Sequence, residues 1–133
     1  MNNWIYKDKI FDEQPGKDRL GFVYYIEHIE TGKYYIGKKQ FWKAIRRKPL
    51  KGQKRVRKDI VASDWKTYWG SSKPFTEYIK TEGEDKFIRT ILSIHEHKSG
   101  LSYEELIQQI KHDVLRDSQS YNGIINVRLS RII

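Results

Sequence analysis

Two short β-rich runs, separated by a compact turn, constrain the fold of this chain more than any other feature. Residues 22–26 (Phe-Val-Tyr-Tyr-Ile) and 34–37 (Tyr-Tyr-Ile-Gly) are rich in aromatic and β-branched side chains, which favour strands. The residues between them include Glu-Thr-Gly-Lys at 30–33, which is typical of a turn. The segment therefore predicts an antiparallel β-hairpin.

The register of this hairpin decides which side chains share a face. A turn centred on Thr31 and Gly32 would pair Tyr24 with Lys39 and His28 with Tyr35. Because side chains alternate between the two faces of a strand, these four residues are all expected on one face. Two phenols and a cation would then share one surface.

A helix and a third strand are predicted further along the chain. Residues 74–82 predict a helix that begins at Pro74, has Ser72 as its N-cap and ends at Gly83. Residues 87–94 alternate sufficiently to predict a strand.

Two more segments have helical patterns. Residues 40–47 are compatible with a helix, and residues 102–117, with Ser102 as N-cap, form the clearest helical pattern in the chain. We therefore expect an α/β (α+β) fold in which helices flank a small three-stranded antiparallel sheet. The predicted apolar face of the last helix is Tyr103, Leu106, Ile107, Ile110 and Val114.

Length and composition set further bounds. The 133 residues suit one domain, which we place at 21–133, preceded by an N-terminal arm at 1–20 that is packed by Trp4 and Ile5. The absence of cysteine excludes disulfides and cysteine-ligated zinc. No apolar run is long enough to span a membrane and no signal-peptide pattern is present, so we expect a soluble cytoplasmic protein.

The charge of the chain points to a polyanionic partner. There are 26 Lys and Arg against 17 Asp and Glu, which gives a formal net charge of +9. Many of the cations fall in a predicted exposed basic loop at 43–64, where nucleic-acid phosphates are the expected partner. Nine cations lie in the stretch 43–58, which has no acid: Lys43, Arg46, Arg47, Lys48, Lys51, Lys54, Arg55, Arg57 and Lys58.

The spacing of the two tyrosines resembles a known signature. Residues 21–24 (Gly-Phe-Val-Tyr) and 35–37 (Tyr-Ile-Gly) place Tyr24 and Tyr35 eleven positions apart. This closely resembles the GIY-YIG nucleases, although Phe-Val-Tyr stands where Gly-Ile-Tyr is usual. The resemblance continues, in order, with Gly70-Ser71-Ser72, Glu82-Gly83, Phe87, Ile91-Leu92, a Glu-bearing helix and Tyr121-Asn122.

Two segments narrow the resemblance within that family. Residues 35–39 (Tyr-Ile-Gly-Lys-Lys) and 64–68 (Asp-Trp-Lys-Thr-Tyr) look most like the phage Seg-type, SegE-like homing endonucleases. The resemblance implies hydrolysis of DNA phosphodiesters with one divalent metal ion, Mg²⁺ or Mn²⁺, in a phage-infected bacterium. Cleavage of both strands would need a homodimer on DNA or two successive events. With no room for a separate DNA-reading domain, specificity is expected to be low or to come from the basic loop and the arm.

The resemblance also implies roles for individual residues. Tyr24 and Tyr35 would activate the nucleophile, and a cation such as Lys39 would lower the pKa of a phenol that is otherwise a poor base. The family arginine falls near position 45, where Arg46 and Arg47 are equal candidates. The family histidine is missing, so its role would pass to a lysine or to Tyr68.

The metal ligand and a nearby amide are expected close to the last helix. By its place before the Tyr-Asn pair, Glu105 is the predicted metal ligand, although a helical wheel centred on Tyr103 turns it away from the core and leaves Glu104 on the flank. Asn122 resembles the family asparagine, with Asn126 as a weaker alternative.

The aromatic cluster of Trp65, Tyr68 and Trp69 beside the basic loop has two interpretations. Such side chains can stack on bases, which would add Trp65 and Tyr68 to the DNA-binding residues, or they can fill the core. The alternatives to an active nuclease are a catalytically inactive nucleic-acid-binding protein of the same fold and a basic RNA-binding protein.

Overall fold

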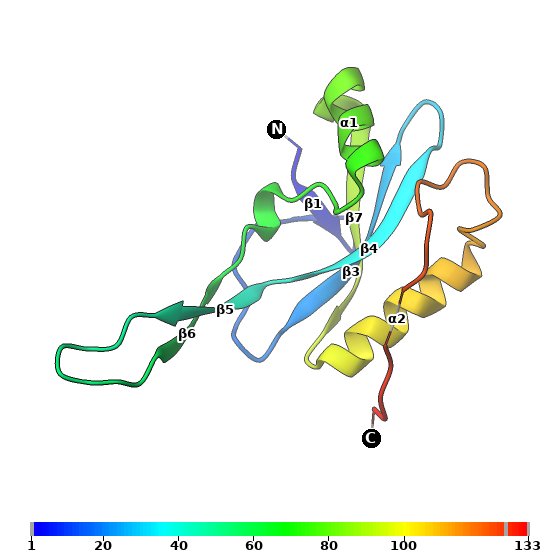
Figure 1. Cartoon of the computed structure of the whole chain (residues 1–133). Coiled ribbons are helices and arrows are strands. Elements are labelled where there is room, and N and C mark those ends of the chain that lie inside the picture. The colour runs from blue at the N-terminus through cyan, green and yellow to red at the C-terminus, as the bar shows by residue number, and fades with distance from the viewer. Residues whose placement is uncertain (1, 127, 133) are drawn as a thin grey trace.

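A five-stranded mixed sheet forms the centre of the molecule (Figure 1). The computed structural model describes residues 2–126 and 128–132. The strand order is β2-β1-β7-β3-β4, with β1 parallel to β7 and the other neighbouring strands antiparallel. The strands are β1 (Trp4–Tyr6), β2 (Lys9–Phe11), β3 (Gly21–His28), β4 (Tyr34–Gln40) and β7 (Phe87–His95).

The predicted three-stranded sheet is the central part of this larger sheet. Strands β3, β4 and β7 are antiparallel as predicted. The predicted number of strands was wrong, because β1 and β2, which lie within residues 1–20, extend the sheet from three strands to five. Each of these two strands has only three residues, and β1 pairs with a strand more than eighty residues away, so no local pattern predicted it. Trp4 on β1 is buried against the rings of Phe22 and Tyr24.

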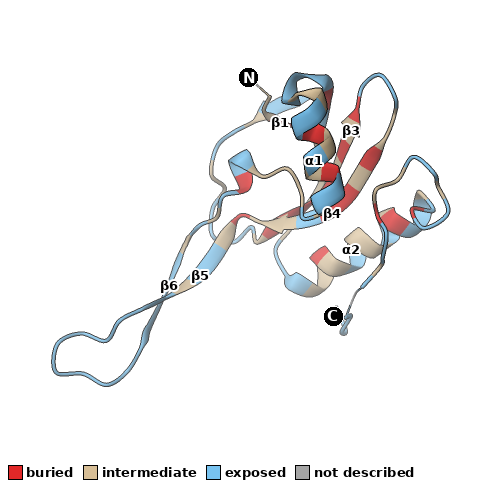
Figure 2. Ribbon diagram, turned by 45° about the horizontal axis from the view of Figure 1, so that its top comes forward, coloured by how far each residue is buried: buried red, intermediate tan, exposed pale blue. Residues whose placement is uncertain are grey.

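Two helices cover opposite faces of the sheet. Helix α1 (Lys73–Glu82) packs Phe75 and Ile79 into the core cluster that contains Tyr24, while α2 (Lys98–Lys111) packs Leu101 against the other face (Figure 2). Short 3₁₀ turns, η1 (Trp65–Thr67) and η2 (Glu84–Lys86), lie on either side of α1 in the sequence. Among the described residues, neither helix has the length and apolar character needed to cross a bilayer.

The predicted N-cap and end of α1 are confirmed, although α1 begins one residue earlier than predicted, at Lys73, and the predictions for α2 are partly wrong. The Ser72 hydroxyl accepts from the Phe75 N–H at 3.3 Å, and α1 ends before Gly83, whose φ is 100°. Helix α2 begins four residues earlier than predicted, at Lys98, and ends at Lys111. Ser102 therefore lies inside the helix and is not its N-cap.

The sheet-facing side of α2 also differs from the predicted apolar face. Leu101 and Gln109 are buried, and they lie in line with Glu105, whereas Ile107 and Ile110 are exposed by 37% and 62%. Residues four apart lie on the same side of a helix, so Glu105 faces the sheet. The helical-wheel objection to Glu105 is therefore wrong.

The β3–β4 register differs by two residues from the predicted one. Tyr24 pairs with Gly37, and Phe22 pairs with Lys39, because the turn is centred one residue earlier than assumed. A shift of two preserves the alternation of faces, so Tyr24, Tyr35 and Lys39 still share a face.

Residues 42–62 form a second sheet and not a helix followed by a loop. Strands β5 (Trp42–Arg47) and β6 (Arg57–Ala62) pair antiparallel along six positions. The predicted helix at 40–47 is thus wrong, and the predicted basic loop is a hairpin with a loop at its tip. Figure 1 shows this hairpin projecting away from the central sheet.

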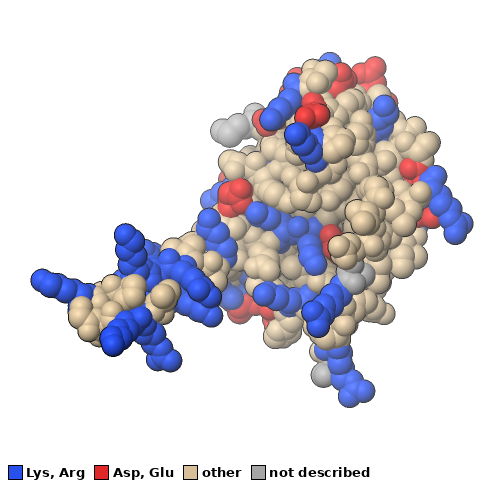
Figure 3. Space-filling view, in the orientation of Figure 1, with Lys and Arg blue, Asp and Glu red and all other residues tan. Residues whose placement is uncertain are grey.

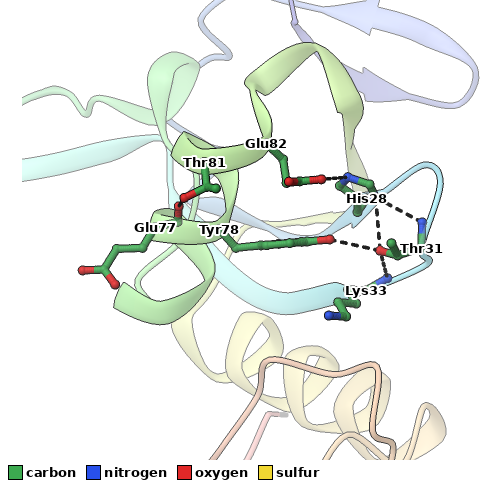
Figure 4. Close-up of polar contacts among 7 residues, drawn as sticks. All are labelled: His28, Thr31, Lys33, Glu77, Tyr78, Thr81 and Glu82. Atoms are coloured by element: carbon green, nitrogen blue, oxygen red, sulfur yellow. Dashed lines mark hydrogen bonds and ion pairs between the residues drawn. The ribbon is translucent and has the colours of Figure 1, made fainter.

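A buried histidine ties the β3–β4 turn to α1 (Figure 4). The Thr31 backbone N–H donates to His28 Nδ1 at 3.1 Å, which places the imidazole proton on Nε2, 3.2 Å from Glu82 Oε1. The Thr31 hydroxyl also reaches the Tyr78 hydroxyl at 3.2 Å, and the His28 ring packs edge-on against Phe87. This cluster joins the β3–β4 turn to the C-terminal part of α1.

His28→Ala is expected to lower the free energy of unfolding by about 2–4 kcal/mol, since it removes a buried ring and its hydrogen bonds. Urea denaturation would measure the change. His97→Ala, at an exposed position before α2, is the matched control and should change stability by less than about 0.5 kcal/mol. Equal effects of the two substitutions would contradict a structural role for the cluster.

Candidate active site

Tyr24 and Tyr35 lie side by side on the α1 face of the sheet. Their ring centroids are 6.2 Å apart, and the Tyr35 ring stacks on Phe75 at 5.8 Å. Two glycines lie against them, and Gly37 leaves space that a side chain would fill, whereas Gly70 has a positive φ of 107°. A Cβ at Gly37 would lie 2.6 Å from Tyr24 Cζ, and a Cβ at Gly70 would lie 3.5 Å from the Tyr24 hydroxyl oxygen.

Gly37→Ala is expected to destabilise the fold by about 1–3 kcal/mol, because the added methyl group would overlap the Tyr24 phenol within a packed site. Thermal or urea denaturation measures this effect. Gly123→Ala provides the control, since a methyl group at that position would have no neighbouring atom within 4 Å. If both variants unfold at the wild-type midpoint, the close approach at Gly37 has no energetic weight.

The two hydroxyl groups have different surroundings. Tyr24 is fully buried, and its hydroxyl makes no hydrogen bond of good geometry among the described residues, although the Tyr68 hydroxyl is close enough to affect its pKa. The half-buried Tyr35 has its hydroxyl 3.0 Å from Ser71 Oγ. Burial raises the pKa of both phenols, and the neighbouring Tyr68 and Glu105 raise them further. The two tyrosines are therefore neutral at neutral pH.

Lys39 was predicted to lower the pKa of these phenols, but the pKa of both is raised. Its Nζ lies 2.7 Å from Asp64 Oδ1 and 4.2 Å from the centre of the Tyr68 ring, so the cation contacts Tyr68. The Tyr68 ring in turn packs edge-on against Tyr24 at 5.9 Å. Tyr68 thus lies next to the tyrosine pair. It was one of the residues predicted to take the role of the missing family histidine.

Glu105 lies on α2, which packs next to the edge strand β4, and its charge acts on both Tyr24 and Tyr35. Its side chain is only 16% exposed, and its Oε1 lies 3.8 Å from Lys38 Nζ, which also donates to the Ser102 hydroxyl at 2.7 Å. Burial raises the pKa of Glu105, against the opposite effect of Lys38. Glu104 points elsewhere and accepts from Gln108 Nε2 at 2.8 Å, which leaves Glu105 as the carboxylate near the tyrosines.

Asn122 is placed as a positioning residue. Its Oδ1 accepts from the Ile36 N–H at 2.9 Å, and its Nδ2 donates to the Ile36 carbonyl at 2.7 Å. Both ends of this buried amide are therefore used to hold β4 between Tyr35 and Gly37. Asn126 is exposed and has no such contact among the described residues.

Several predicted site residues lie away from the tyrosines. Arg46 and Arg47 are exposed on β5, where Arg47 Nε donates to Asp59 Oδ2 at 3.0 Å. Their predicted place in the site fails because residues 42–47 extend as a strand away from the sheet. Trp65 is fully buried against Phe41, so it cannot stack on a base. The other predicted DNA contacts on the hairpin are exposed: Lys43, Lys48, Lys51, Lys54, Arg55, Arg57 and Lys58.

The structure adds residues that the sequence patterns did not assign. Ser71 is the partner of Tyr35, and Lys38 is the partner of Glu105. The alternation of β4 could have suggested the second, because it sends Lys38 and Lys39 to opposite faces. Arg89 on β7 is buried between the Trp4 and Trp69 rings and donates to the Tyr68 carbonyl at 2.7 Å.

A comparison with known protein families identifies the family of the chain. The family model described as "Putative endonuclease segE, GIY-YIG domain" matches residues 4–125. A search of curated proteins and one of solved structures returned no significant match. The matched segment includes both tyrosines, the Gly70-Ser71 turn, Glu105 and Asn122. The chain therefore belongs to the SegE-like GIY-YIG nuclease family.

Proposed function

We propose that this protein is a divalent-metal-dependent DNA endonuclease that hydrolyses phosphodiester bonds at the tyrosine pair. Membership of a nuclease family makes DNA the expected substrate. The observation that carries the proposal is the Tyr24 hydroxyl, which is buried between Gly37 and Gly70 and makes no hydrogen bond of good geometry among the described residues. An unpaired buried hydroxyl costs about 1–3 kcal/mol, so its retention favours a functional role over simple packing.

Tyr35 is the phenol that substrate can reach. It is half-buried, whereas Tyr24 is closed off from solvent. Because burial keeps both phenols neutral, the Tyr35 hydroxyl acts as a hydrogen-bonding group that orients the attacking water. Lys39, held by Asp64, supplies positive charge near the pentacoordinate phosphate.

Glu105 is the residue that would hold the metal ion. No group of three or more His, Cys, Asp or Glu side chains able to bind a metal occurs in the described part of the chain. One carboxylate nevertheless suits Mg²⁺, which commonly binds through one or two carboxylates together with water and substrate phosphate oxygens. When bound, the ion would neutralise developing charge on the phosphate.

A supercoiled-plasmid assay tests this function. Wild-type protein should nick the plasmid in Mg²⁺ or Mn²⁺ and should stop in EDTA. Cleavage that persists in EDTA would overturn the metal-dependent mechanism.

An alternative is a catalytically inactive DNA-binding protein of the same fold. The placement of Arg46 and Arg47 on the projecting hairpin favours it, because the two arginines predicted to be catalytic then lie away from the tyrosines. This alternative predicts DNA binding in the same assay mixture with no nicking at any Mg²⁺ or Mn²⁺ concentration.

A further inference from the structure

The β5–β6 hairpin has little packing of its own. None of its twelve strand residues is fully buried, and most are exposed. Figure 3 shows Lys and Arg side chains surrounding this projection, in contrast to the mixed charges on the rest of the visible face. The hairpin therefore exposes nearly all of its surface to a partner.

The pairing of the strands places like charges opposite one another. Arg46 pairs with Lys58, and Arg47 pairs with Arg57, at the end of the ribbon next to the loop. Like charges directly across a strand pair destabilise it. A polyanion would remove the repulsion between Arg46 and Lys58, whereas Arg47 already has Asp59 as a partner.

The two faces of the ribbon are not equivalent. On one face Arg47 is tied to Asp59 at 3.0 Å, and Arg57 donates to the Lys48 carbonyl at 3.3 Å. The opposite face combines cations with small or apolar side chains. This face, the open face, carries the cross-strand pairs Trp42 with Ala62, Ala44 with Ile60 and Arg46 with Lys58.

The dimensions of the ribbon match one groove of duplex DNA. Its strands are about 4.8 Å apart and its six paired positions reach about 20 Å, at about 3.3 Å per residue. A two-stranded ribbon fits the major groove, which is about 12 Å wide and in which each base pair presents a distinct pattern of hydrogen-bonding groups. Arginine bonds to guanine there, and an apolar side chain such as Ile60, 51% exposed, can contact a thymine methyl group.

Three lysines surround a hollow between the edge strand β4 and the base of the ribbon. A hollow of about 340 Å³ is lined by Lys38, Lys39 and Lys43 together with Trp42 and Ser63. Lys39 belongs to the site and Lys43 to β5. A phosphate backbone that follows these cations would run from the site to the ribbon.

We infer that the β5–β6 hairpin is a DNA-reading ribbon whose open face lies in the major groove of duplex DNA, to one side of the cleaved bond. The inference rests on the proposed function only in taking DNA as the partner. Binding to the ribbon does not require cleavage, so the two can be tested separately.

The first test measures binding to a fluorescent duplex in EDTA. The double substitution R46Q/K58Q should weaken binding at least 10-fold near 0.15 M salt and reduce the slope of log K against log [salt] by about 2, roughly one for each lost phosphate or base contact. R47Q/R57Q removes the same number of charges from the opposite face, is the matched control and should change affinity less than 3-fold. Circular dichroism checks that each variant is folded.

The second test identifies the groove. Methylation of guanine N7, which lies in the major groove, should interfere with binding, whereas methylation of adenine N3, in the minor groove, should not, at the base pairs next to the ribbon. Interference confined to adenine N3, equal losses for R46Q/K58Q and R47Q/R57Q, or no duplex binding by the wild-type chain would each overturn the inference.

The two proposals fail in different ways. Groove-specific binding without nicking in Mg²⁺ would reject the endonuclease and retain the ribbon. If R46Q/K58Q nicks the plasmid and binds DNA with wild-type affinity, the ribbon is rejected and the endonuclease is retained.

Discussion

Tyr35→Phe is expected to lower the rate of plasmid nicking by about 10²-fold or more, since it removes the hydroxyl that orients the attacking water. The phenol is the reachable member of the buried tyrosine pair, and its hydroxyl lies 3.0 Å from Ser71 Oγ. The substitution keeps the ring that stacks on Phe75, so DNA affinity and the fold should be nearly unchanged. Single-turnover nicking and duplex binding in EDTA measure the two quantities separately.

The control for this substitution lies one residue after Tyr24. Tyr25→Phe removes a hydroxyl from the opposite face of β3, where the ring stacks on Tyr34 at 5.1 Å. It should nick at close to the wild-type rate. If Tyr35→Phe retains cleavage, or Tyr25→Phe loses as much, the tyrosine pair is not the active site.

Glu105→Gln is expected to reduce metal-dependent nicking by at least about 10²-fold, since the neutral amide is a much poorer ligand for a hard cation. Glu104→Gln, one residue away and bonded to Gln108, is the matched control and should remain active. A Mg²⁺ titration of both variants, with binding of Mn²⁺ followed by its paramagnetic effect on water relaxation, distinguishes loss of metal from loss of fold. Activity in Glu105→Gln equal to that in Glu104→Gln would reject the metal ligand.

The stability of the fold and the rate of nicking should both change with pH in a direction set by Glu105. Burial raises the pKa of Glu105, so the folded chain holds this proton more tightly than the unfolded chain does. Ionised Glu105 therefore costs stability at neutral pH, and the cost disappears as the pH falls through the raised pKa. Glu105→Gln should unfold at the wild-type urea midpoint or above it. Wild-type nicking should decline with falling pH earlier than an ordinary glutamate would predict.

Local patterns were sufficient for the elements whose residues determine their own structure. The β3–β4 hairpin was predictable because its two runs are β-rich and alternate around a polar turn. Helix α1 was predictable because Ser72, Pro74 and Gly83 mark its ends. The shared face of Tyr24 and Tyr35 survived an error of two in the register, since alternation depends only on parity.

Other features depend on contacts between distant segments. Strand β1 is too short to be identified alone and is stabilised by pairing with β7. Residues 42–47 become a strand because β6 pairs with them, and this carries Arg46 and Arg47 away from the site. Weak local preferences such as these are decided by the partner that the tertiary structure supplies.

The sequence by itself determined the family, the spacing of the two tyrosines and the excess of positive charge, because each of these is a property of residue order and composition. Only the tertiary structure decided that Glu105 faces the sheet, since the rotation of α2 follows from how Leu101 and Gln109 pack and not from the helix's own apolar stripe. It also decided that the basic segment is a paired ribbon, because the pairing of β5 with β6 brings its cations onto two distinct faces.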